Sequence, residues 1–305
     1  MINDPARGSV TFDMRGETVL VTGAGTGIGR EIALAFARCG ADVVFHHSSS
    51  SAGALSGVAE AEALGVRAVA LRADLSNLDE VASLATDAAA ALGKVDILVN
   101  NSGITYNAPF LRMEADRFQK LYDVNVRAGF FLTQALVPAM IERRDGAILN
   151  LTSVHGLQGA AEHAAYAGTK GAIIAQTRAL GIELAYQGVR VNAIAPGWID
   201  VENHALAVPD YDAATTALTA ARQIPVGRIG KSADIAQLAL FLCSEAASFI
   251  TGQCFVADGG TTALMSLFPD FRSPSSARFG ERYMGNSAAQ YRMANQAAQM
   301  AFDRK

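Results

Sequence analysis

Short apolar runs rich in β-branched residues alternate with helical patterns along most of the chain, and this alternation constrains the fold most strongly. Predicted strands occupy residues 18–22, 42–45, 68–72, 96–100, 146–152, 189–195 and 254–257. Predicted helices occupy residues 27–39, 52–64, 78–92, 115–143 with an interruption near Val124, 164–187 and 233–245, and an irregular stretch precedes the last of them. Strands that are apolar almost throughout are typical of a parallel sheet with helices on both faces. The sequence therefore predicts an α/β fold with a doubly wound sheet.

Composition and charge limit the classes of function. Apolar residues make up 50% and charged residues 18% of the 305 residues, which predicts extensive burial. A net charge of −4 gives no electrostatic reason to expect a nucleic-acid partner. Residues 1–15 contain neither the apolar segment of a signal peptide nor a membrane span, and Cys39, Cys243 and Cys254 lack metal-ligand spacing. We therefore expect a cytoplasmic protein with no membrane partner.

A glycine-rich turn follows the first predicted strand directly and has the sequence Thr22-Gly23-Ala24-Gly25-Thr26-Gly27-Ile28-Gly29. Glycine is needed where the backbone must approach a pyrophosphate closely, and the N-terminus of the following helix favours its negative charge. The alternative interpretation is a tight strand-to-helix turn with no ligand. The position between a strand and a helix favours a dinucleotide-binding turn.

Tyr166 and Lys170 lie one helical turn apart within a predicted helix, so the phenol and the ammonium share a face. An ammonium beside a phenol favours phenolate, which predicts a lowered pKa for Tyr166 and a role as general acid/base. Ser153 ends the fifth predicted strand, where its hydroxyl can polarise a carbonyl group. Together with the glycine-rich turn, these residues predict a hydride-transfer site.

The ordered motifs resemble those of the short-chain dehydrogenase/reductase family over residues 16–262. In chain order they are Thr22-Gly23-x-x-x-Gly27-x-Gly29, Asn100-Asn101-Ser102-Gly103, Asn125, Ser153, Tyr166-x-x-x-Lys170 and Pro196-Gly197. The resemblance implies one Rossmann-type catalytic domain with a doubly wound parallel sheet of about seven strands. It also implies a homo-oligomer, either a tetramer or a dimer. The implied reaction is NAD(P)-dependent hydride transfer between nicotinamide and a secondary alcohol or ketone.

The resemblance also implies the catalytic roles. Tyr166 would be the general acid/base, and Lys170 would stabilise its phenolate and bind the nicotinamide ribose. Ser153 would orient the substrate carbonyl. Asn125 would hold a water next to the lysine, and an asparagine inside a helix is intrinsically unfavourable, which favours a local reason for it.

Further residues would bind the cofactor by the same resemblance. They are Gly23, Thr26, Gly27, Ile28, Gly29, His47, Ser48, Asp74, Leu75, Asn101, Gly103, Tyr166, Lys170, Pro196, Gly197 and Ile199. Capping of a helix is the alternative interpretation for Asp74. Val201 stands where the family often has a threonine, so one hydroxyl contact to the cofactor is missing.

The end of the second predicted strand bears on the choice of nicotinamide cofactor. An acidic residue there binds the ribose 2′-hydroxyl and repels a 2′-phosphate. This chain has Phe45-His46-His47-Ser48-Ser49-Ser50 without any carboxylate, and partly cationic histidines and serine hydroxyls would accommodate a 2′-phosphate. We therefore expect NADP, with NAD or dual use left open because no arginine or lysine clamps the phosphate.

The substrate pocket is expected above the carboxyl ends of the strands. Its predicted lining residues are Ser153, His155, Gln158, His163, Tyr166 and Trp198, with residues 200–211 as a lid. These polar side chains favour a sugar, polyol or hydroxy-acid substrate, whereas ordinary surface residues are the alternative. The histidines lack the spacing of metal ligands, so no metal is expected.

Two other functions remain open at this point. A reductase of 3-oxoacyl groups on an acidic carrier protein would need a basic docking surface, to which Arg127, Arg178 and Arg190 could contribute. A non-enzymatic NAD(P)-binding regulator would have lost Tyr166 or Lys170, and this chain keeps both.

Both ends of the chain lie outside the predicted catalytic domain, as an N-terminal arm over residues 1–15 and a C-terminal extension over residues 263–305. The extension contains many large apolar residues, and residues 286–302 are predicted to be helical. We expect it to pack near the active-site mouth or on a subunit surface.

Overall fold

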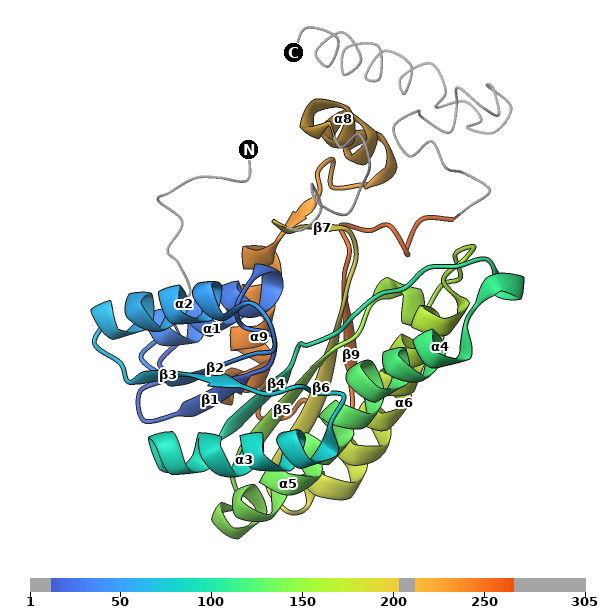
Figure 1. Ribbon diagram of the computed structural model, residues 1–305. Helices are drawn as coiled ribbons and strands as arrows, with labels where there is room; N and C mark the ends of the chain where they lie inside the picture. Colours follow the sequence, from blue (N-terminus) through green and yellow to red (C-terminus); the bar gives the residue numbers. More distant parts are fainter. Residues whose placement is uncertain (1–11, 203–211, 266–305) are drawn as a thin grey trace, which may run out of the picture. The chain divides into compact units, whose positions relative to one another are not determined.

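The computed structural model describes residues 12–202 and 212–265 of the chain (Figure 1). The chain divides into two compact units, Met1–Gly259 and Gly260–Lys305. Most of the predicted N-terminal arm, the predicted lid from residue 203 onward and the predicted C-terminal extension from residue 266 onward lie outside the described residues. The fold and the site described below belong to the first unit.

Seven strands form one parallel sheet in the order β3-β2-β1-β4-β5-β6-β9, which confirms the predicted fold class (Figure 1). Their bounds are β1 Thr18–Val21, β2 Asp42–His47, β3 Ala68–Arg72, β4 Ile97–Asn100, β5 Gly146–Leu151, β6 Val189–Pro196 and β9 Cys254–Ala257. The direction in which strands are added reverses between β1 and β4. In such open sheets, ligands bind outside the carboxyl ends of the strands at this reversal. The glycine-rich turn follows β1 at this edge of the sheet.

Helices cover both faces of the sheet (Figure 1). Their bounds are α1 Gly27–Arg38, α2 Ser51–Ala63, α3 Leu78–Leu92, α4 Ala115–Tyr122, α5 Ala128–Arg143, α6 Ala164–Ala185, α8 Ala213–Gln223 and α9 Ser232–Cys243. Buried residues of α1, α2 and α9 pack in one hydrophobic cluster, and buried residues of α3, α5 and α6 pack in a second. The sheet therefore separates two apolar layers, as its apolar strands predict.

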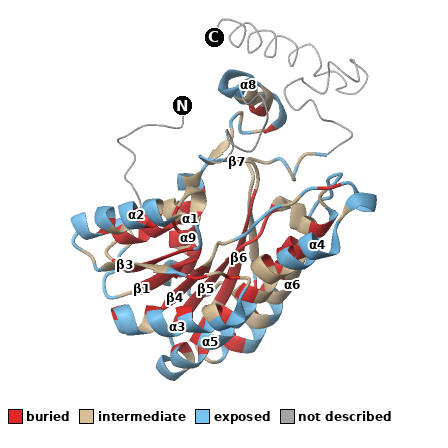
Figure 2. Ribbon diagram, viewed as in Figure 1, coloured by how far each residue is buried: buried red, intermediate tan, exposed pale blue. Residues whose placement is uncertain are grey.

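Strand β1 shows how the sequence produces this arrangement. Val19 and Val21 belong to the first cluster and Leu20 to the second, because successive strand side chains point to opposite faces. All three side chains are completely buried, and Figure 2 shows the central strands in the colour of buried residues. Because both faces of β1 are covered by an apolar layer, neither face can carry polar residues. The strand therefore has a continuous apolar sequence.

Two features of the chain depart from regular helices and strands. A π-helical turn, η2 (Asp123–Arg127), joins α4 to α5, where the sequence predicts an interruption near Val124. The stretch after β6 was predicted to be irregular, and this is wrong in part. It contains α8 and a second, two-stranded sheet of β7 (Ile199–Asp200) and β8 (Gly230–Lys231). Strands of two residues leave no periodicity in the sequence.

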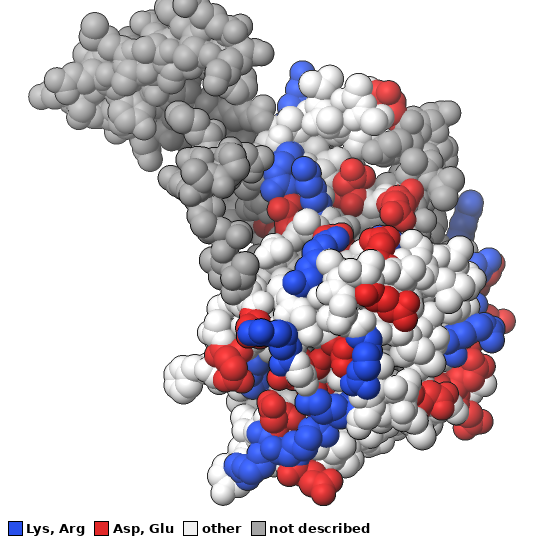
Figure 3. Space-filling view, turned by 90° about the vertical axis from the view of Figure 1, so that its left-hand side faces the viewer, with Lys and Arg blue, Asp and Glu red and all other residues white. Residues whose placement is uncertain are grey.

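The remaining short elements are the 3₁₀ turns η1 (Phe110–Arg112), η3 (Val154–Gly156) and η4 (Glu245–Ala247). Among the described residues, the helical stretch 115–143 is long and apolar enough to cross a membrane by length and composition. Leu132 and Met140 on this stretch are completely buried in the second cluster, which is the pattern of a core helix. On the face shown in Figure 3, basic and acidic side chains are interspersed rather than gathered by sign.

Candidate active site

Helix α6 brings Tyr166 and Lys170 to the carboxyl end of β5. Lys170 is only 4% exposed, and its ammonium donates a hydrogen bond of 3.0 Å to the carbonyl of Leu151, the last residue of β5. The ammonium nitrogen lies 5.6 Å from the centre of the Tyr166 ring. Ser153 is buried just beyond the same strand, and its side chain is hydrogen-bonded to that of Tyr166. The structure therefore brings the three predicted catalytic side chains together.

The pKa of Tyr166 differs from the sequence expectation. Burial raises it, and the hydrogen bond to Ser153 opposes this rise without cancelling it. The predicted lowering by Lys170 is wrong for this arrangement, because the ammonium is turned to the Leu151 carbonyl and is itself removed from water. Burial lowers the pKa of Lys170 to about 8. Desolvation thus brings both groups closer to their neutral forms.

Asn125 is buried in the π-helical turn, and its amide is fully engaged. Its Oδ1 accepts a bond of 2.8 Å from the Ile104 backbone N–H, while its Nδ2 donates to the Ile104 carbonyl at 2.9 Å and to Thr169 Oγ1 at 3.2 Å. A Cβ on Gly103 would lie 3.4 Å from Asn125 Oδ1 and 3.5 Å from Lys170 Nζ. The side chain of Asn125 therefore fixes the segment after β4 beside the lysine.

The glycine-rich turn packs so closely that side chains are excluded from it. Gly23 and Gly27 adopt φ angles of 66° and 56°, which other residues rarely accept. A Cβ on Gly29 would collide with the Gly23 carbonyl and with the amide of Asn101. That amide donates to the Thr22 carbonyl at 2.8 Å and so ties the end of β4 to the turn. Without side chains at these glycines, a pyrophosphate can approach the backbone closely at the N-terminus of α1.

His46 has a structural role that the sequence did not reveal. Its side chain is 1% exposed, with Nδ1 accepting from the Gly23 N–H and Nε2 bonded to the Ala73 carbonyl, both at 3.1 Å. These partners require the neutral tautomer with the proton on Nε2. Burial lowers the pKa of His46 to about 4. The prediction that this histidine is partly cationic is therefore wrong.

His47 and Ser48 lie at the end of β2 in a different situation. The His47 side chain is 7% exposed, and its Nδ1 is buried without a hydrogen-bond partner among the described residues. Ser48 follows directly and is exposed. An orphaned buried nitrogen is costly unless a ligand or water satisfies it. Of the two adjacent histidines, only His47 has a ring atom left for a ligand.

Asp74 forms a turn before α3, whereas the helix cap that the sequence left as its alternative role is made by Asn77. Its Oδ1 accepts bonds from the Ser76 N–H at 2.9 Å and the Ser76 hydroxyl at 2.8 Å, and these bonds lower its pKa. Its backbone N–H donates to Glu80 at 2.7 Å. The neighbouring Leu75 is 6% exposed and packs in the second cluster. One carboxylate oxygen of Asp74 is thus committed to the turn before α3.

The segment after β6 approaches the glycine-rich turn from the other side. Pro196 ends β6, Gly197 is half-buried against Asp258, and Ile199 is 6% exposed. A Cβ on Gly27 would lie 3.4 Å from the Val201 side chain, and Thr26 Oγ1 donates to the Glu202 carboxylate at 2.8 Å. A cavity of about 410 Å³ opens here and is lined by Gly27, Arg30, Glu31, Asp200, Val201, Glu202 and Ser232. Ile28 lies beside it in the first turn of α1.

Glu202 was missed by the sequence analysis. It lies 176 residues from its partner Thr26, and a carboxylate in an irregular stretch carries no local signal of such a contact. Only the folded chain places an acidic group at the turn that receives a pyrophosphate.

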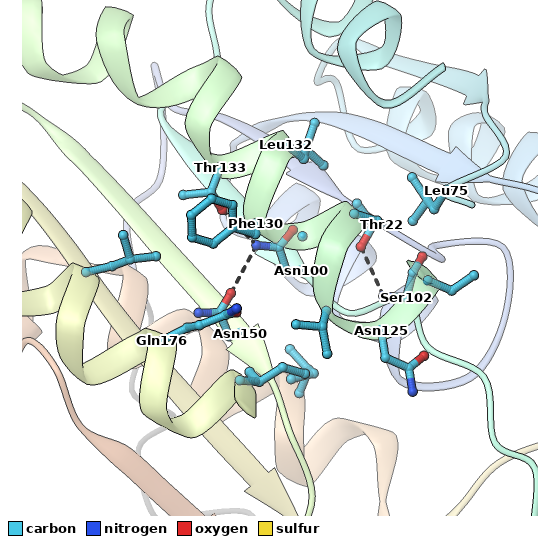
Figure 4. A pocket seen from close by; sticks show the side chains of 17 residues that line it. Thr22, Leu75, Asn100, Ser102, Asn125, Phe130, Leu132, Thr133, Asn150 and Gln176 are labelled. Atoms are coloured by element: carbon cyan, nitrogen blue, oxygen red, sulfur yellow. Dashed lines mark hydrogen bonds between the residues drawn. The ribbon is translucent and has the colours of Figure 1, made fainter. Parts of the chain in front are cut away.

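Behind the site, a small cavity of about 30 Å³ lies between β4, β5, α5 and α6 (Figure 4). Asn100 donates to Thr133 Oγ1 at 3.1 Å and to Asn150 Oδ1 at 3.0 Å across it. Asn100 Oδ1 is buried without a partner among the described residues. The volume suffices for one water molecule next to this oxygen. These bonds fix the end of β4, from which the segment 101–104 starts.

The predicted substrate-lining residues lie in two groups. The rings of His155 and His163 are stacked with centroids 4.5 Å apart, and the His155 ring meets the Tyr166 ring edge-on at 5.9 Å. Gln158 is exposed on the segment that follows η3. Trp198 is half-buried, and its carbonyl accepts a bond of 2.9 Å from the Gly230 N–H. The histidines are therefore next to Tyr166. Within the described residues, no group of His, Cys, Asp and Glu side chains could hold a metal ion.

Comparisons with known proteins agree with this geometry. The family model described as enoyl-(acyl carrier protein) reductase matches residues 23–262. The 3-oxoacyl-[acyl-carrier-protein] reductase of Staphylococcus epidermidis is 39% identical over 244 residues, which cover 80% of this chain and 98% of that protein.

Two solved structures extend the comparison to the fold. The structure of a putative NAD(P)-dependent gluconate 5-dehydrogenase from Beutenbergia cavernae with bound NADP is 38% identical, with a TM-score of 0.77, and covers 84% of this chain and 100% of that one. A 7α-hydroxysteroid dehydrogenase in complex with NADH is 37% identical, with a TM-score of 0.76, and covers 81% and 95%. The chain belongs to the short-chain dehydrogenase/reductase family, whose members are NAD(P)-dependent oxidoreductases acting on alcohol and keto groups.

Proposed function

We propose that this protein reduces the 3-oxo group of a 3-oxoacyl thioester to the 3-hydroxyl, with NADPH as the hydride donor. The observation that carries the proposal is the buried group of Ser153, Tyr166 and Lys170 at the end of β5. The identity of 39% to a 3-oxoacyl-[acyl-carrier-protein] reductase, almost end to end for that relative, favours this substrate class over the predicted sugars and polyols.

The chain's own residues divide the work of the reaction. NADPH, when bound, supplies the hydride. Ser153 donates a hydrogen bond to the substrate carbonyl oxygen, and Tyr166 passes its phenolic proton to the same oxygen as the alkoxide forms. In this proposal the Lys170 ammonium, 5.6 Å from the ring centre, turns from the Leu151 carbonyl to the phenolate that remains and stabilises it there. Asn125 and Gly103 hold the segment after β4 against the lysine.

The residues present fit a dinucleotide. The bare turn at Gly23, Gly27 and Gly29 would hold the pyrophosphate on the N-terminus of α1. Preference for NADP is supported by the end of β2, which carries no carboxylate and leaves the Nδ1 of His47 free beside the exposed Ser48. A ring N–H of His47 and the Ser48 hydroxyl would both donate to a 2′-phosphate. NAD or dual use remains the competing prediction.

A second substrate class is favoured by one observation. His155 and His163 make the wall beside Tyr166 polar, and a relative of the same fold is described as a putative gluconate 5-dehydrogenase. A small hydroxy ketone or keto acid is therefore the second candidate.

Assembly as a homo-oligomer, a tetramer or a dimer, is part of the proposal. Large apolar side chains are exposed on consecutive helical elements of one region, namely Phe110, Leu111, Phe118, Phe130 and Phe131. A monomer rarely exposes so many together. The cytoplasmic location stays a prediction from the sequence.

Two of the three arginines named for carrier docking are bonded within the chain. Arg190 donates to the carbonyls of Leu242, Cys243 and Ser244, and Arg127 is paired with Asp123 at 3.0 Å. The proposal therefore concerns the thioester itself and does not rest on a carrier-docking surface.

Oxidation of NADPH and NADH, followed by absorbance at the nicotinamide band, tests the proposed function. Acetoacetyl-coenzyme A, 5-keto-gluconate and 3-hydroxy-2-butanone serve as substrates. We expect the highest kcat/KM with NADPH and the thioester. A kcat/KM for the thioester far below that for the keto acid or the hydroxy ketone would refute the thioester proposal and favour the second candidate.

A further inference from the structure

Two imidazole rings stand beside the catalytic tyrosine. His155 belongs to η3, directly after Ser153, and His163 precedes the first residue of α6. Their rings are parallel within 11° and 4.5 Å apart, and we call them the histidine pair. The edge of the pair meets Tyr166, because the His155 ring lies 5.9 Å from the tyrosine ring at 73°.

His163 is held on both ring nitrogens. Its Nδ1 lies 2.7 Å from the Ala161 carbonyl and its Nε2 lies 3.0 Å from the amide nitrogen of Asn107. The carbonyl can only accept, so the ring proton belongs on Nδ1, and Nε2 accepts from Asn107. Asn107 in turn accepts from Thr105 Oγ1 at 3.1 Å. The segment after β4 thus fixes the orientation of His163.

His155 is in the opposite situation. Its backbone N–H donates to Ser153 Oγ at 3.2 Å. This bond holds the backbone of His155 beside the Ser153 hydroxyl. Within residues 12–202 and 212–265, its ring nitrogens make no hydrogen bond, although the residue is half-buried. Burial and, to a smaller extent, the neighbouring His163 lower the pKa of His155, so the ring is neutral at pH 7. It therefore offers one N–H donor and one acceptor next to Ser153 and Tyr166.

Stacking on His163 fixes the direction in which the His155 ring nitrogens point. An isolated imidazole on a short surface turn would sample several rotamers. The His155 ring has few rotamers available, because His163 covers its face and Tyr166 lies against its edge. A neutral donor suits a carbonyl or hydroxyl oxygen better than it suits a carboxylate, which prefers a cation. The substrate oxygen within reach of His155 would lie beside the substrate carbonyl that Ser153 and Tyr166 would bind.

We propose that His155 is a specificity-determining residue that donates a hydrogen bond to a second, uncharged oxygen of the substrate, one or two carbon atoms from the carbon that accepts the hydride. His163 is a positioning residue that acts through its stacking on His155. The inference rests on the proposed function and narrows its substrate class to 3-oxoacyl thioesters and vicinal hydroxy ketones. Simple ketones lack the second oxygen and are poor substrates.

Comparison of matched substrates tests this role. Acetoacetyl-coenzyme A and 3-hydroxy-2-butanone carry the second oxygen, and cyclohexanone lacks it. In His155→Phe the ring can still stack on His163 but has no polar atoms. We expect kcat/KM to fall about three- to tenfold for the two substrates with the second oxygen and to stay within about twofold for cyclohexanone, as loss of one hydrogen bond requires.

Two further variants separate recognition from support of Tyr166. His155→Gln keeps a donor and an acceptor, so it should recover part of the lost discrimination. His163→Phe keeps the stacking surface and loses the bond to Asn107. It should therefore change the ratio of kcat/KM between 3-hydroxy-2-butanone and cyclohexanone less than His155→Phe does. Circular dichroism and NADPH affinity confirm that each variant folds.

Several outcomes would overturn the proposal. An equal loss for all three substrates means that His155 only supports Tyr166, and unchanged kcat/KM means that it touches no substrate. If wild type fails to reduce the thioester, the proposed 3-oxoacyl function is wrong, but the ratio between 3-hydroxy-2-butanone and cyclohexanone still decides the role of His155.

Discussion

Replacing the buried Lys170 by methionine should abolish turnover and yet stabilise the folded protein at neutral pH. The side chain is 4% exposed, and burial lowers its pKa from 10.5 to about 8. At about 1.4 kcal/mol per pKa unit, this difference corresponds to roughly 3 kcal/mol of unfavourable free energy for the charged form in the folded state. Methionine leaves the Leu151 carbonyl without its partner, which costs about 1 kcal/mol. We therefore expect a net gain of about 2 kcal/mol in the free energy of unfolding at pH 7.

The gain should depend on pH in a defined way. Below pH 8 the lysine is charged in both the folded and the unfolded state, so the full penalty acts on the wild type. Between about pH 8 and 10.5 the unfolded state binds more protons than the folded state, and wild-type stability rises with pH relative to the variant. Above pH 10.5 both states are neutral and the gain disappears. The variant's advantage should thus shrink as pH rises through this window.

Urea unfolding of both proteins at a series of pH values measures this difference. The matched control is Lys120→Met on the exposed surface of α4, which should change stability by less than about 0.5 kcal/mol at every pH. A Lys170→Met protein that is less stable than wild type at pH 7, or a difference that does not vary with pH, would show that the ammonium is well solvated or well paired in the folded protein.

Three further predictions concern turnover and the cofactor. Tyr166→Phe should lower kcat by roughly 10²–10⁴-fold while NADPH affinity is unchanged, because only the transferable proton is lost, and near-normal turnover would contradict the mechanism. His47→Asp should shift the ratio of kcat/KM values towards NADH by about tenfold or more, since a carboxylate repels a 2′-phosphate, and an unchanged ratio would place the discrimination elsewhere. Glu202→Gln should tighten NADPH binding about threefold, because a carboxylate bonded to Thr26 opposes a pyrophosphate at the α1 N-terminus. Glu31→Gln, in the same cavity, is its control, and an equal effect there would mean that only net charge matters.

The sheet and most helices could be predicted because their signals are local. Strands β3 and β9 and helix α3 have the predicted bounds, since each is a continuous pattern closed by a turn. Helix α8 was missed because it lies inside a stretch with few large apolar residues, and of its own residues only Ala220 is buried. The strands β7 and β8 depend on a pairing between Ile199 and Gly230 that no local pattern records.

The grouping of Ser153, Tyr166 and Lys170 was predictable from spacing, but their electrostatics were not. Sequence places Lys170 one turn from Tyr166, and this predicts a lowered tyrosine pKa. The structure turns the ammonium to the Leu151 carbonyl and buries both groups, so desolvation decides the direction. His46 illustrates the same limit, because its neutral state depends on Gly23 and Ala73, which only folding brings to its ring.

Polar side chains around the site fall into two classes. Those of the first class are hydrogen-bonded within the protein, and those of the second keep polar atoms without a partner among the described residues. His46 bonds backbone groups with both ring nitrogens, and the side chains of Asn101 and Asn125 tie backbone segments together, so their loss would first disturb the fold. His47, at the end of β2, and His155, beside Tyr166, keep ring nitrogens without a partner among the described residues. Unpaired polar atoms in a partly dry site are unfavourable unless a ligand completes them. We therefore expect substitutions in the first class to lower the free energy of unfolding, and substitutions in the second to change cofactor or substrate preference while stability is preserved.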